Sequence, residues 1–231
     1  MRAFSIAIFA ILCIARAAGQ SVPPSAKASA PADMTGYWVA FITEDWRFRM
    51  VTPRKGDYQA VPITDQARKV ADAWSPEADE AAGNQCKAYG AAAIMRLAAR
   101  FHITWQDENT LRVESDAGMQ TRLFHFGSQP GALGERTWQG YSNAQWQGPA
   151  LKIATTNLRS GYLRKNGVPY SENAVATEYF DSAPLPGGGQ VLLVTTVVDD
   201  PQYLRQPFIV SSQFKKEADG SKWDPTPCTA K

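Results

Sequence analysis

The chain has 231 residues, of which 44% are hydrophobic and 20% charged, with 24 basic and 22 acidic side chains. This near-neutral balance argues against nucleic acid as a partner, because phosphate binding needs a surplus of Lys and Arg. A chain of this length can form one domain with a substantial core.

The first 19 residues, MRAFSIAIFAILCIARAAG, have the layout of a secretory signal peptide. Arg2 is followed by an apolar run from Ala3 to Ala15, and the small residues beyond it fit cleavage after Ala17 or after Gly19. The run is too short for a comfortable membrane span. We expect a periplasmic or secreted protein without stable membrane insertion; the alternative is an uncleaved anchor. Without Arg2 and Arg16, the 24 basic residues fall to 22, against 22 acidic ones.

Residues 20–33, QSVPPSAKASAPAD, are rich in Pro, Ala and Ser and show no periodicity, which predicts a tether. The remainder, residues 34–231, is predicted to form a single domain.

This domain begins with Thr35–Pro53, in which aromatic and β-branched side chains alternate as in a strand. Charged residues interrupt the middle of the run, at Glu44, Asp45, Arg47 and Arg49. We expect one long strand with one packed face, whose charged half lies at the open, wetter end of the fold.

Two helix starts follow this segment. Thr64 fits the N-cap of a helix over DQARKVADAW, and Ser75 with Pro76 fits the N-cap and first position of a helix over PEADEAAGNQC. Together they predict a small α-helical insertion near residues 64–85. The alanine-rich residues 86–99 fit either a helix or an irregular approach to a strand.

From Arg100 to Lys216, short runs of β-branched and aromatic residues alternate with turn sequences such as DENT, DAG and PLPGGG. They correspond to eight or nine strands at short spacing. Sequential antiparallel strands with few crossover helices predict a mainly β domain, an antiparallel meander that closes into a barrel.

Gly36 and Trp38, in TGYW, resemble the Gly-x-Trp opening of the lipocalins, a family in which this Trp plugs the closed end of an eight-stranded barrel. Most of the mature chain is also similar to a group of secreted bacterial proteins without assigned function. The segments that carry this likeness are Cys86–Gly90, Trp146–Asn157, Gly167–Phe180 and Asp200–Pro207. The resemblance implies a calycin-like or lipocalin-like barrel and no particular chemistry.

Cys86 and Cys228 are the cysteines that remain once Cys13 is removed with the signal peptide. In an oxidising compartment two cysteines most simply form one disulfide; the alternative is two unpaired thiols. The bridge would close a loop of about 140 residues and would stabilise the fold by about 4–5 kcal/mol in the chain-entropy account. It would also hold the C-terminal tail against the helical region.

Polar and aromatic side chains in the predicted strands and loops are the candidate ligand-binding residues. Glu44 and Glu178 interrupt strand faces that are otherwise largely apolar, and such a carboxylate either meets an Arg or has a raised pKa. The loop Asn157–Asn173 is longer than an ordinary hairpin turn and is either a lid over the barrel mouth or a surface loop. The candidates are Glu44, Trp46, His102, Trp105, Arg122, His125, Asn157, Arg164 and Glu178.

Three functions are compatible with these residues. The leading hypothesis is an exported small-molecule-binding barrel for an apolar or partly polar ligand, with Glu44, Arg122 and Glu178 setting its polarity and Trp46 and Trp105 as walls. An alternative is a cofactor-free isomerase, cyclase or hydrolase with a Glu or His as acid–base group. A further alternative is a structural envelope protein. The sequence has no G-x-S-x-G elbow and no zinc-ligand spacing, so we expect no metal and no cofactor.

Overall fold

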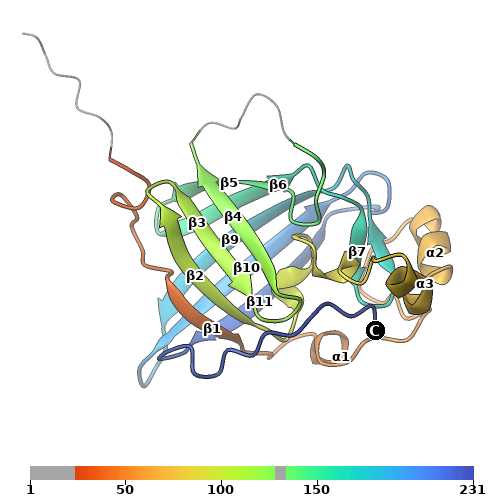
Figure 1. Ribbon diagram of the computed structural model, residues 1–231, viewed down its shortest axis with the longest axis horizontal. Coiled ribbons are helices and arrows are strands. Elements are labelled where there is room, and N and C mark those ends of the chain that lie inside the picture. The colour runs from red at the N-terminus through yellow and green to blue at the C-terminus, as the bar shows by residue number, and fades with distance from the viewer. Residues whose placement is uncertain (1–23, 128–133) are drawn as a thin grey trace, which may run out of the picture.

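The computed structural model describes residues 24–127 and 134–231. Nine strands close into a barrel in the order β1-β11-β10-β9-β6-β5-β4-β3-β2 (Figure 1). The prediction of a mainly β chain with a closed barrel is therefore confirmed. The predicted signal peptide, residues 1–19, lies outside the described residues.

The barrel strands are β1 (Gly36–Ala40), β2 (Arg100–Asp107), β3 (Thr110–Ser115), β4 (Gln120–Phe126), β5 (Tyr141–Gln147), β6 (Ala150–Thr156), β9 (Val175–Pro184), β10 (Gln190–Asp199) and β11 (Phe208–Lys216). A separate two-stranded sheet is formed by β7 (Gly161–Arg164) and β8 (Val168–Tyr170). The helices are α1 (Trp46–Arg49), α2 (Asp65–Asp72) and α3 (Pro76–Ala81), with two 3-10 turns, η1 (Lys87–Tyr89) and η2 (Ile94–Arg96).

The predicted long strand over Thr35–Pro53 is wrong beyond its first residues. Strand β1 ends at Ala40, and the chain turns through Asp45, whose φ of 50° is left-handed, into the four-residue helix α1. The cause is the neighbouring strand: β2 begins at Arg100, opposite Val39, so a longer β1 would have no partner on that side. An alternation of aromatic and charged residues fits a short helix as well as a strand.

The meander is antiparallel except at one pair. Strands β4 and β5 are parallel, with Phe124 opposite Ser142, whereas the other barrel neighbours pair antiparallel. The chain therefore returns after β4 to the barrel end at which β4 begins. The prediction of an antiparallel meander is wrong at this pair.

The helical insertion is confirmed near residues 64–85. The side chain of Thr64 accepts a hydrogen bond from the Ala67 amide at 3.2 Å, and that of Ser75 accepts one from the Ala78 amide at 3.2 Å. These N-caps satisfy amide groups that have no partner within the helix. The alanine-rich residues 86–99 form the two 3-10 turns η1 and η2 rather than a continuous helix.

Three long connections meet at one end of the barrel: residues 41–99, 157–174 and 200–207. We call them together the cap. Figure 1 shows its helices and the β7–β8 hairpin side by side at that end. The Thr64 amide donates to the Tyr203 carbonyl at 2.9 Å, and Ile63 forms a β-bridge with Leu204, so distant segments are joined. The buried apolar residues that hold the cap on the barrel include Leu158, Leu163, Tyr170, Val198 and Phe208.

The barrel interior is filled by side chains. Trp38, Phe101, Phe124, Phe180 and Phe214 are buried there, each at most 1% exposed. Phe101 packs edge-on against Phe214, and Phe124 packs in the same way against Phe180. Such offset aromatic pairs pack densely, as protein interiors do. The space that we expected to hold a ligand is therefore occupied by a core.

Cys86 and Cys228 form the predicted disulfide, with 5.1 Å between their Cα atoms. After β11 the chain returns along the outside of the barrel, where Trp223 packs edge-on against Tyr37 and Thr226 forms a bridge with Ala117. The C-terminus consequently lies beside the cap (Figure 1).

At the other end of the barrel, residues 24–33 of the predicted tether contact the turn between β2 and β3. The Lys27 amide donates to the Glu108 carbonyl at 3.0 Å, and the Ala26 amide donates to Asn109 Oδ1 at 2.9 Å. Within the described ranges, none of the helices has the length and apolar character needed to span a membrane.

Replacing both cysteines, as Cys86→Ser with Cys228→Ser, should lower the free energy of unfolding by about 2–5 kcal/mol, because the open chain gains entropy when unfolded. Urea unfolding followed by tryptophan fluorescence measures this, and proteolysis should then cleave the released tail first. An unchanged urea midpoint would show that the bridge contributes nothing to stability.

Candidate ligand-binding site

A cavity of about 210 Å³ lies in the cap, beside α1, η1, η2 and the end of β7. Its apolar walls include Phe48, Leu97 and Leu163, and its polar walls include Arg49, Arg96 and Arg164. Ligand sites commonly combine such apolar walls with a few polar groups.

Arg49 ends helix α1, and its side chain is shielded from solvent. Its Nη1 pairs with the Glu44 carboxylate, and its Nε donates to the Arg96 carbonyl at 3.0 Å. Burial, opposed by the Glu44 charge, lowers the pKa of Arg49. The third nitrogen, Nη2, is buried without a hydrogen-bond partner in the described part of the chain.

Arg96, in η2, is the second buried guanidinium of the cavity wall. Its Nη2 donates to Asp45 Oδ2 at 3.1 Å, and its Cζ lies 5.6 Å from the centre of the Phe208 ring. Burial lowers the pKa of Arg96, and the charge of Asp45 opposes this effect. Asp45 thus neutralises Arg96 as Glu44 neutralises Arg49.

Arg164, at the end of β7, differs from Arg49 and Arg96 in its hydrogen-bond and charge partners. Its Nη1 donates to the Gln59 carbonyl at 2.7 Å, and its Cζ lies 4.1 Å from the centre of the Phe48 ring. It is 4% exposed, and among the described residues it has no carboxylate within ion-pair distance. Burial, together with the charge of Arg96, lowers its pKa to about 10.

The Nε and Nη2 atoms of Arg164 are also buried without a partner in the described ranges. Buried charged groups are normally paired, because an uncompensated charge away from water costs several kcal/mol. Among the described residues, three guanidinium nitrogens of two cavity-lining arginines therefore lack an acceptor.

Lys165 adds a cation to the three arginines of the cavity wall. Its Nζ donates hydrogen bonds to Tyr89 Oη and to Thr229 Oγ1, both at 3.1 Å, so two hydroxyl groups already bind this ammonium group. Burial alone would raise the pKa of Tyr89, but the hydrogen bonds with Thr229 and Lys165 hold it below its ordinary value. Since Thr229 follows Cys228, the disulfide positions this part of the wall.

Two of the predicted site residues meet at this cavity. Arg164 lines it, and Glu44 reaches it through its ion pair with Arg49. Trp46 lies on the solvent side of α1 with 66% of its surface exposed, so it is not a wall of the cavity.

Arg122 and Glu178 lie together inside the barrel, apart from the cavity. Both are at most 1% exposed; Arg122 Nη1 is 3.0 Å from Glu178 Oε1, and its Nη2 pairs with Oε2. The same Nη2 donates to Thr155 Oγ1 at 3.3 Å, and this hydroxyl is 2.7 Å from that of Ser142. Both carboxylate oxygens are thus used within a closed, bidentate pair.

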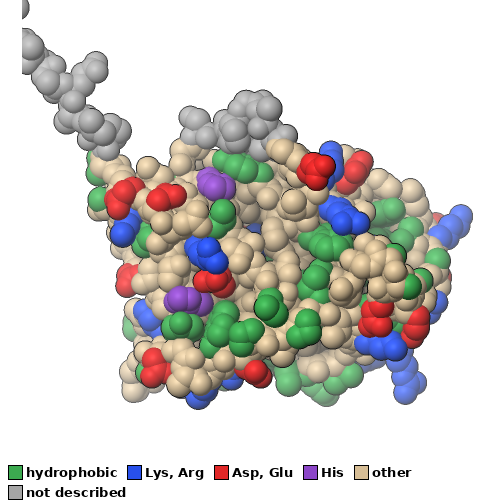
Figure 2. Space-filling view, in the orientation of Figure 1, with side chains coloured by type: hydrophobic (Ala, Val, Ile, Leu, Met, Phe, Trp, Pro, Cys, Tyr) green, Lys and Arg blue, Asp and Glu red, His purple; other side chains and the backbone are tan. Residues whose placement is uncertain are grey.

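The remaining predicted residues are dispersed. His102 stacks on Tyr37 at 4.0 Å and His125 stacks on Tyr141 at 5.0 Å, both on the outer wall, where Figure 2 shows exposed histidine side chains. Trp105 packs against Phe126 within the barrel. Asn157 has a left-handed φ of 56° and donates to the carbonyl groups of residues 134 and 135, which fixes a turn.

The sequence contained a signal for the two arginines that were not among the candidates. Arg96 is a single charge in the apolar run AAAIMRLAA, and Arg49 closes the charged segment that begins at Glu44. A lone Arg in an apolar run is either paired inside the fold or exposed at its edge. Their joint position could not be inferred, because α1, η2 and β7 are far apart in the chain.

Comparison with protein-family models, with curated proteins and with solved structures finds no match for this chain. The closed nine-stranded barrel is consistent with the lipocalin-like architecture expected from Gly36 and Trp38. Membership in that family, or in the group of secreted bacterial proteins, stays a prediction.

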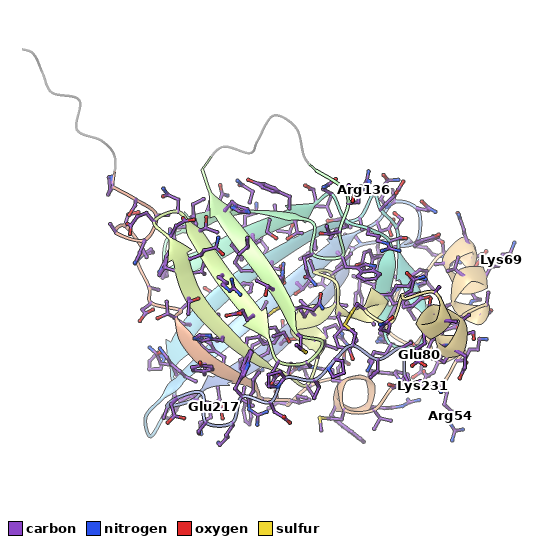
Figure 3. The ribbon with its side chains drawn as sticks, in the orientation of Figure 1. Arg54, Lys69, Glu80, Arg136, Glu217 and Lys231 are labelled. Atoms are coloured by element: carbon purple, nitrogen blue, oxygen red, sulfur yellow. A yellow bond between two sulfur atoms is a disulfide. The ribbon has the colours of Figure 1, made fainter. Side chains whose placement is uncertain are left out.

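Replacing Glu178 by Gln should lower the free energy of unfolding by about 3–5 kcal/mol, because the Arg122 charge would remain buried without its partner. The double variant Arg122→Met with Glu178→Leu should cost less than the two single changes together. Urea unfolding measures the stability of the single and the double variants. The matched control is Glu80→Gln, at an exposed position (Figure 3). A cost below about 1 kcal/mol for Glu178→Gln would contradict a structural role for the pair.

Proposed function

We propose that this protein is an exported small-molecule-binding barrel whose ligand is a small organic anion held in the cap cavity. The observation that carries the proposal is that three buried arginines, Arg49, Arg96 and Arg164, line one cavity, and that Arg164 has no carboxylate within ion-pair distance among the described residues.

The charges of the cavity favour an anion. Glu44 and Asp45 form ion pairs with Arg49 and Arg96, whereas among the described residues Arg164 binds a carbonyl and an aromatic face and feels the charges of Asp45 and Asp57 from beyond ion-pair distance. An incoming anion would compensate this charge in a region shielded from water, where electrostatic interactions are stronger than in solvent.

The walls and size of the cavity restrict the ligand further. Phe48, Leu97 and Leu163 give apolar surface for an organic body, and a volume of about 210 Å³ is smaller than that of a typical drug-sized pocket. A compact molecule with one charged group and a short apolar part fits these conditions.

Export is supported by the Cys86–Cys228 disulfide, since such bonds persist in oxidising compartments. The N-terminal sequence of Met1–Gly19 is the other support. A periplasmic or secreted binding protein therefore remains our proposal for its location and role.

An acid–base enzyme has less support. Both oxygens of Glu178 are engaged by Arg122, and both histidines lie on the outer wall of the barrel. A purely structural role gives no reason for a cavity lined by three buried arginines, one of which has no carboxylate within ion-pair distance among the described residues.

A panel of small carboxylates, phosphate esters and sulfonates tests the proposal, with thermal unfolding as the readout. A ligand at ten times its Kd stabilises the fold by about 1.4 kcal/mol, which corresponds to a Tm rise of about 3–6 °C for a chain of this size. Native mass spectrometry of protein purified without added ligand should also detect a co-purifying small acid.

Arg164→Gln should abolish the Tm rise. Arg54 is exposed and points away from the molecule (Figure 3), so Arg54→Gln should leave the rise unchanged. Equal stabilisation by neutral analogues of the same shape, or no stabilisation by any of the anions, would refute an anion site.

A further inference from the structure

We infer that the cap binds the surface of anionic lipid membranes through residues 41–55, whose exposed apolar side chains enter the interface without spanning the bilayer. Lipid binding would need no ligand in the cap cavity, so this inference stands apart from the proposed function. Three features of the segment support it: an exposed apolar patch, ion pairs that hold the backbone in place, and unpaired charges of one sign.

Large apolar side chains are concentrated on the surface of this segment. Eight such side chains are exposed among the described residues, and four of them lie within residues 41–51. These four are Phe41, Trp46, Met50 and Val51, with exposed fractions of 50%, 66%, 60% and 66%. Single exposed apolar residues are common on protein surfaces, whereas a group of them marks an interaction site.

The apolar side chains of the segment belong to one patch. Trp46 and Met50 lie one helical turn apart, and the Met50 amide donates to the Trp46 carbonyl at 2.9 Å, so both are on the same side of α1. Met50 and Ile42 line a groove of about 380 Å³ together with Ala98 and Ala99. Figure 2 shows hydrophobic side chains along the lower margin of the molecule, in the region where Figure 1 places α1.

Ion pairs on the inner side hold the segment in this position. Glu44 pairs with the buried Arg49, and Asp45 pairs with the buried Arg96 at 3.1 Å. Trp46 follows directly after these two acids and would have to break their ion pairs to turn inward. The fold therefore presents apolar side chains to water on a fixed backbone, an unfavourable exposure that a bound partner would remove.

The unpaired charges of the segment are positive. Its acids are all engaged, because Asp57 pairs with Arg47 in addition to the ion pairs of Glu44 and Asp45. Arg54 and Lys55 are exposed and have no carboxylate within ion-pair distance in the described ranges.

These cations make the surface around the apolar patch complementary to an anionic bilayer. Arg54 points away from the molecule (Figure 3), where it can approach lipid head groups. A Lys or Arg beside an anionic membrane strengthens binding by about fivefold. Exposed Trp side chains next to exposed cations are typical of segments that lie in the membrane interface.

A membrane explains this patch better than a protein partner does. A specific protein interface takes about 20–30 residues from each side, many more than the few apolar side chains exposed here. A two-fold dimer through the patch would bring Arg54 and Lys55 of one copy towards the same cations of the other. A bilayer accepts single side chains, and the amphipathic ring of Trp favours the boundary between lipid and water.

Sedimentation with lipid vesicles tests the inference. The chain is used from Gln20 onwards, because the apolar residues 3–15 would bind lipid themselves. Vesicles of phosphatidylglycerol and phosphatidylcholine in equal parts should bind the protein at least about tenfold more tightly than vesicles of phosphatidylcholine, since two cations at about fivefold each give this preference. Raising NaCl from about 0.1 M to about 1 M should weaken the binding, because the screening length falls from about 10 Å to about 3 Å.

Two methionines form a matched pair for the apolar contribution. Met50→Ala should weaken binding to the charged vesicles by at least about fivefold, because a buried Met side chain is worth more than this factor. Met119, in the turn between β3 and β4, is 63% exposed, and Met119→Ala should change the affinity by less than about twofold.

Trp46→Ala should weaken binding by at least about tenfold. Circular dichroism and Tm verify that each variant is folded, and Val51→Ser is the second variant if Trp46→Ala does not fold. For the charges, Arg54→Gln with Lys55→Gln should remove the preference for phosphatidylglycerol. The control Lys69→Gln, at an exposed position on α2 (Figure 3), should keep it.

Several results would overturn membrane binding and leave the anion site of the cavity untouched. One is the absence of sedimentation with the charged vesicles. Another is an equal loss of affinity in Met50→Ala and Met119→Ala, or an unchanged affinity in Trp46→Ala. A dimer in light scattering that Trp46→Ala dissociates, without binding to vesicles, would show that the patch joins two copies of the chain.

Discussion

The cap cavity of this protein contains a buried cation without an ion-pair partner among the described residues, and burying such a charge costs free energy. Arg164 is 4% exposed, and two of its three guanidinium nitrogens lack a partner in the described part of the chain. Burial of an unpaired charge opposes folding by several kcal/mol, and burial also lowers the pKa of this arginine. A group held in this state at a cavity is most simply explained by the molecule that it binds.

A comparison within the same chain makes the contrast clear. Arg122 is equally buried, but both oxygens of Glu178 pair with its two Nη groups inside the barrel, so its charge is compensated although its Nε has no partner in the described part of the chain. That pair closes on itself and leaves no role for a ligand. At the cavity the acids Glu44 and Asp45 form ion pairs with Arg49 and Arg96, whereas Arg164 has no carboxylate within ion-pair distance among the described residues. One fold therefore contains buried arginines with and without an ion-pair partner.

The barrel serves as the support for this site. Its filled interior and its closed ring of strands give a rigid base, and the three long connections that form the cap pack against one end of it. The Cys86–Cys228 bridge brings the C-terminal tail to the same place, where Thr229 contacts Lys165. Residues far apart in the sequence thus meet at one cavity, although none of them lies on a barrel wall.

The sequence predicted local structure well and distant contacts poorly. The N-caps at Thr64 and Ser75 depend on neighbouring residues, so the sequence predicted these helices, and the largely apolar strand face that Glu178 interrupts is a buried face. The length of β1 depends on where its partner strand begins, and the parallel β4–β5 pair depends on the path of a connection. The alternation of apolar and polar residues also indicates which positions face inward. It does not show whether the inward side chains fill the barrel, because the width of the interior depends on the number and tilt of the strands. The meeting of Arg49, Arg96 and Arg164 at one cavity likewise depends on tertiary packing.

The free energy of unfolding of Arg164→Met, measured without ligand by urea titration, shows whether the buried Arg164 charge opposes folding. Methionine has a similar shape and no charge, so it removes the cost of the buried guanidinium and keeps most of the packing. We predict a stability equal to or above that of the native chain. A loss of more than about 2 kcal/mol would show that Arg164 is a structural residue already satisfied by its surroundings, and would contradict the account.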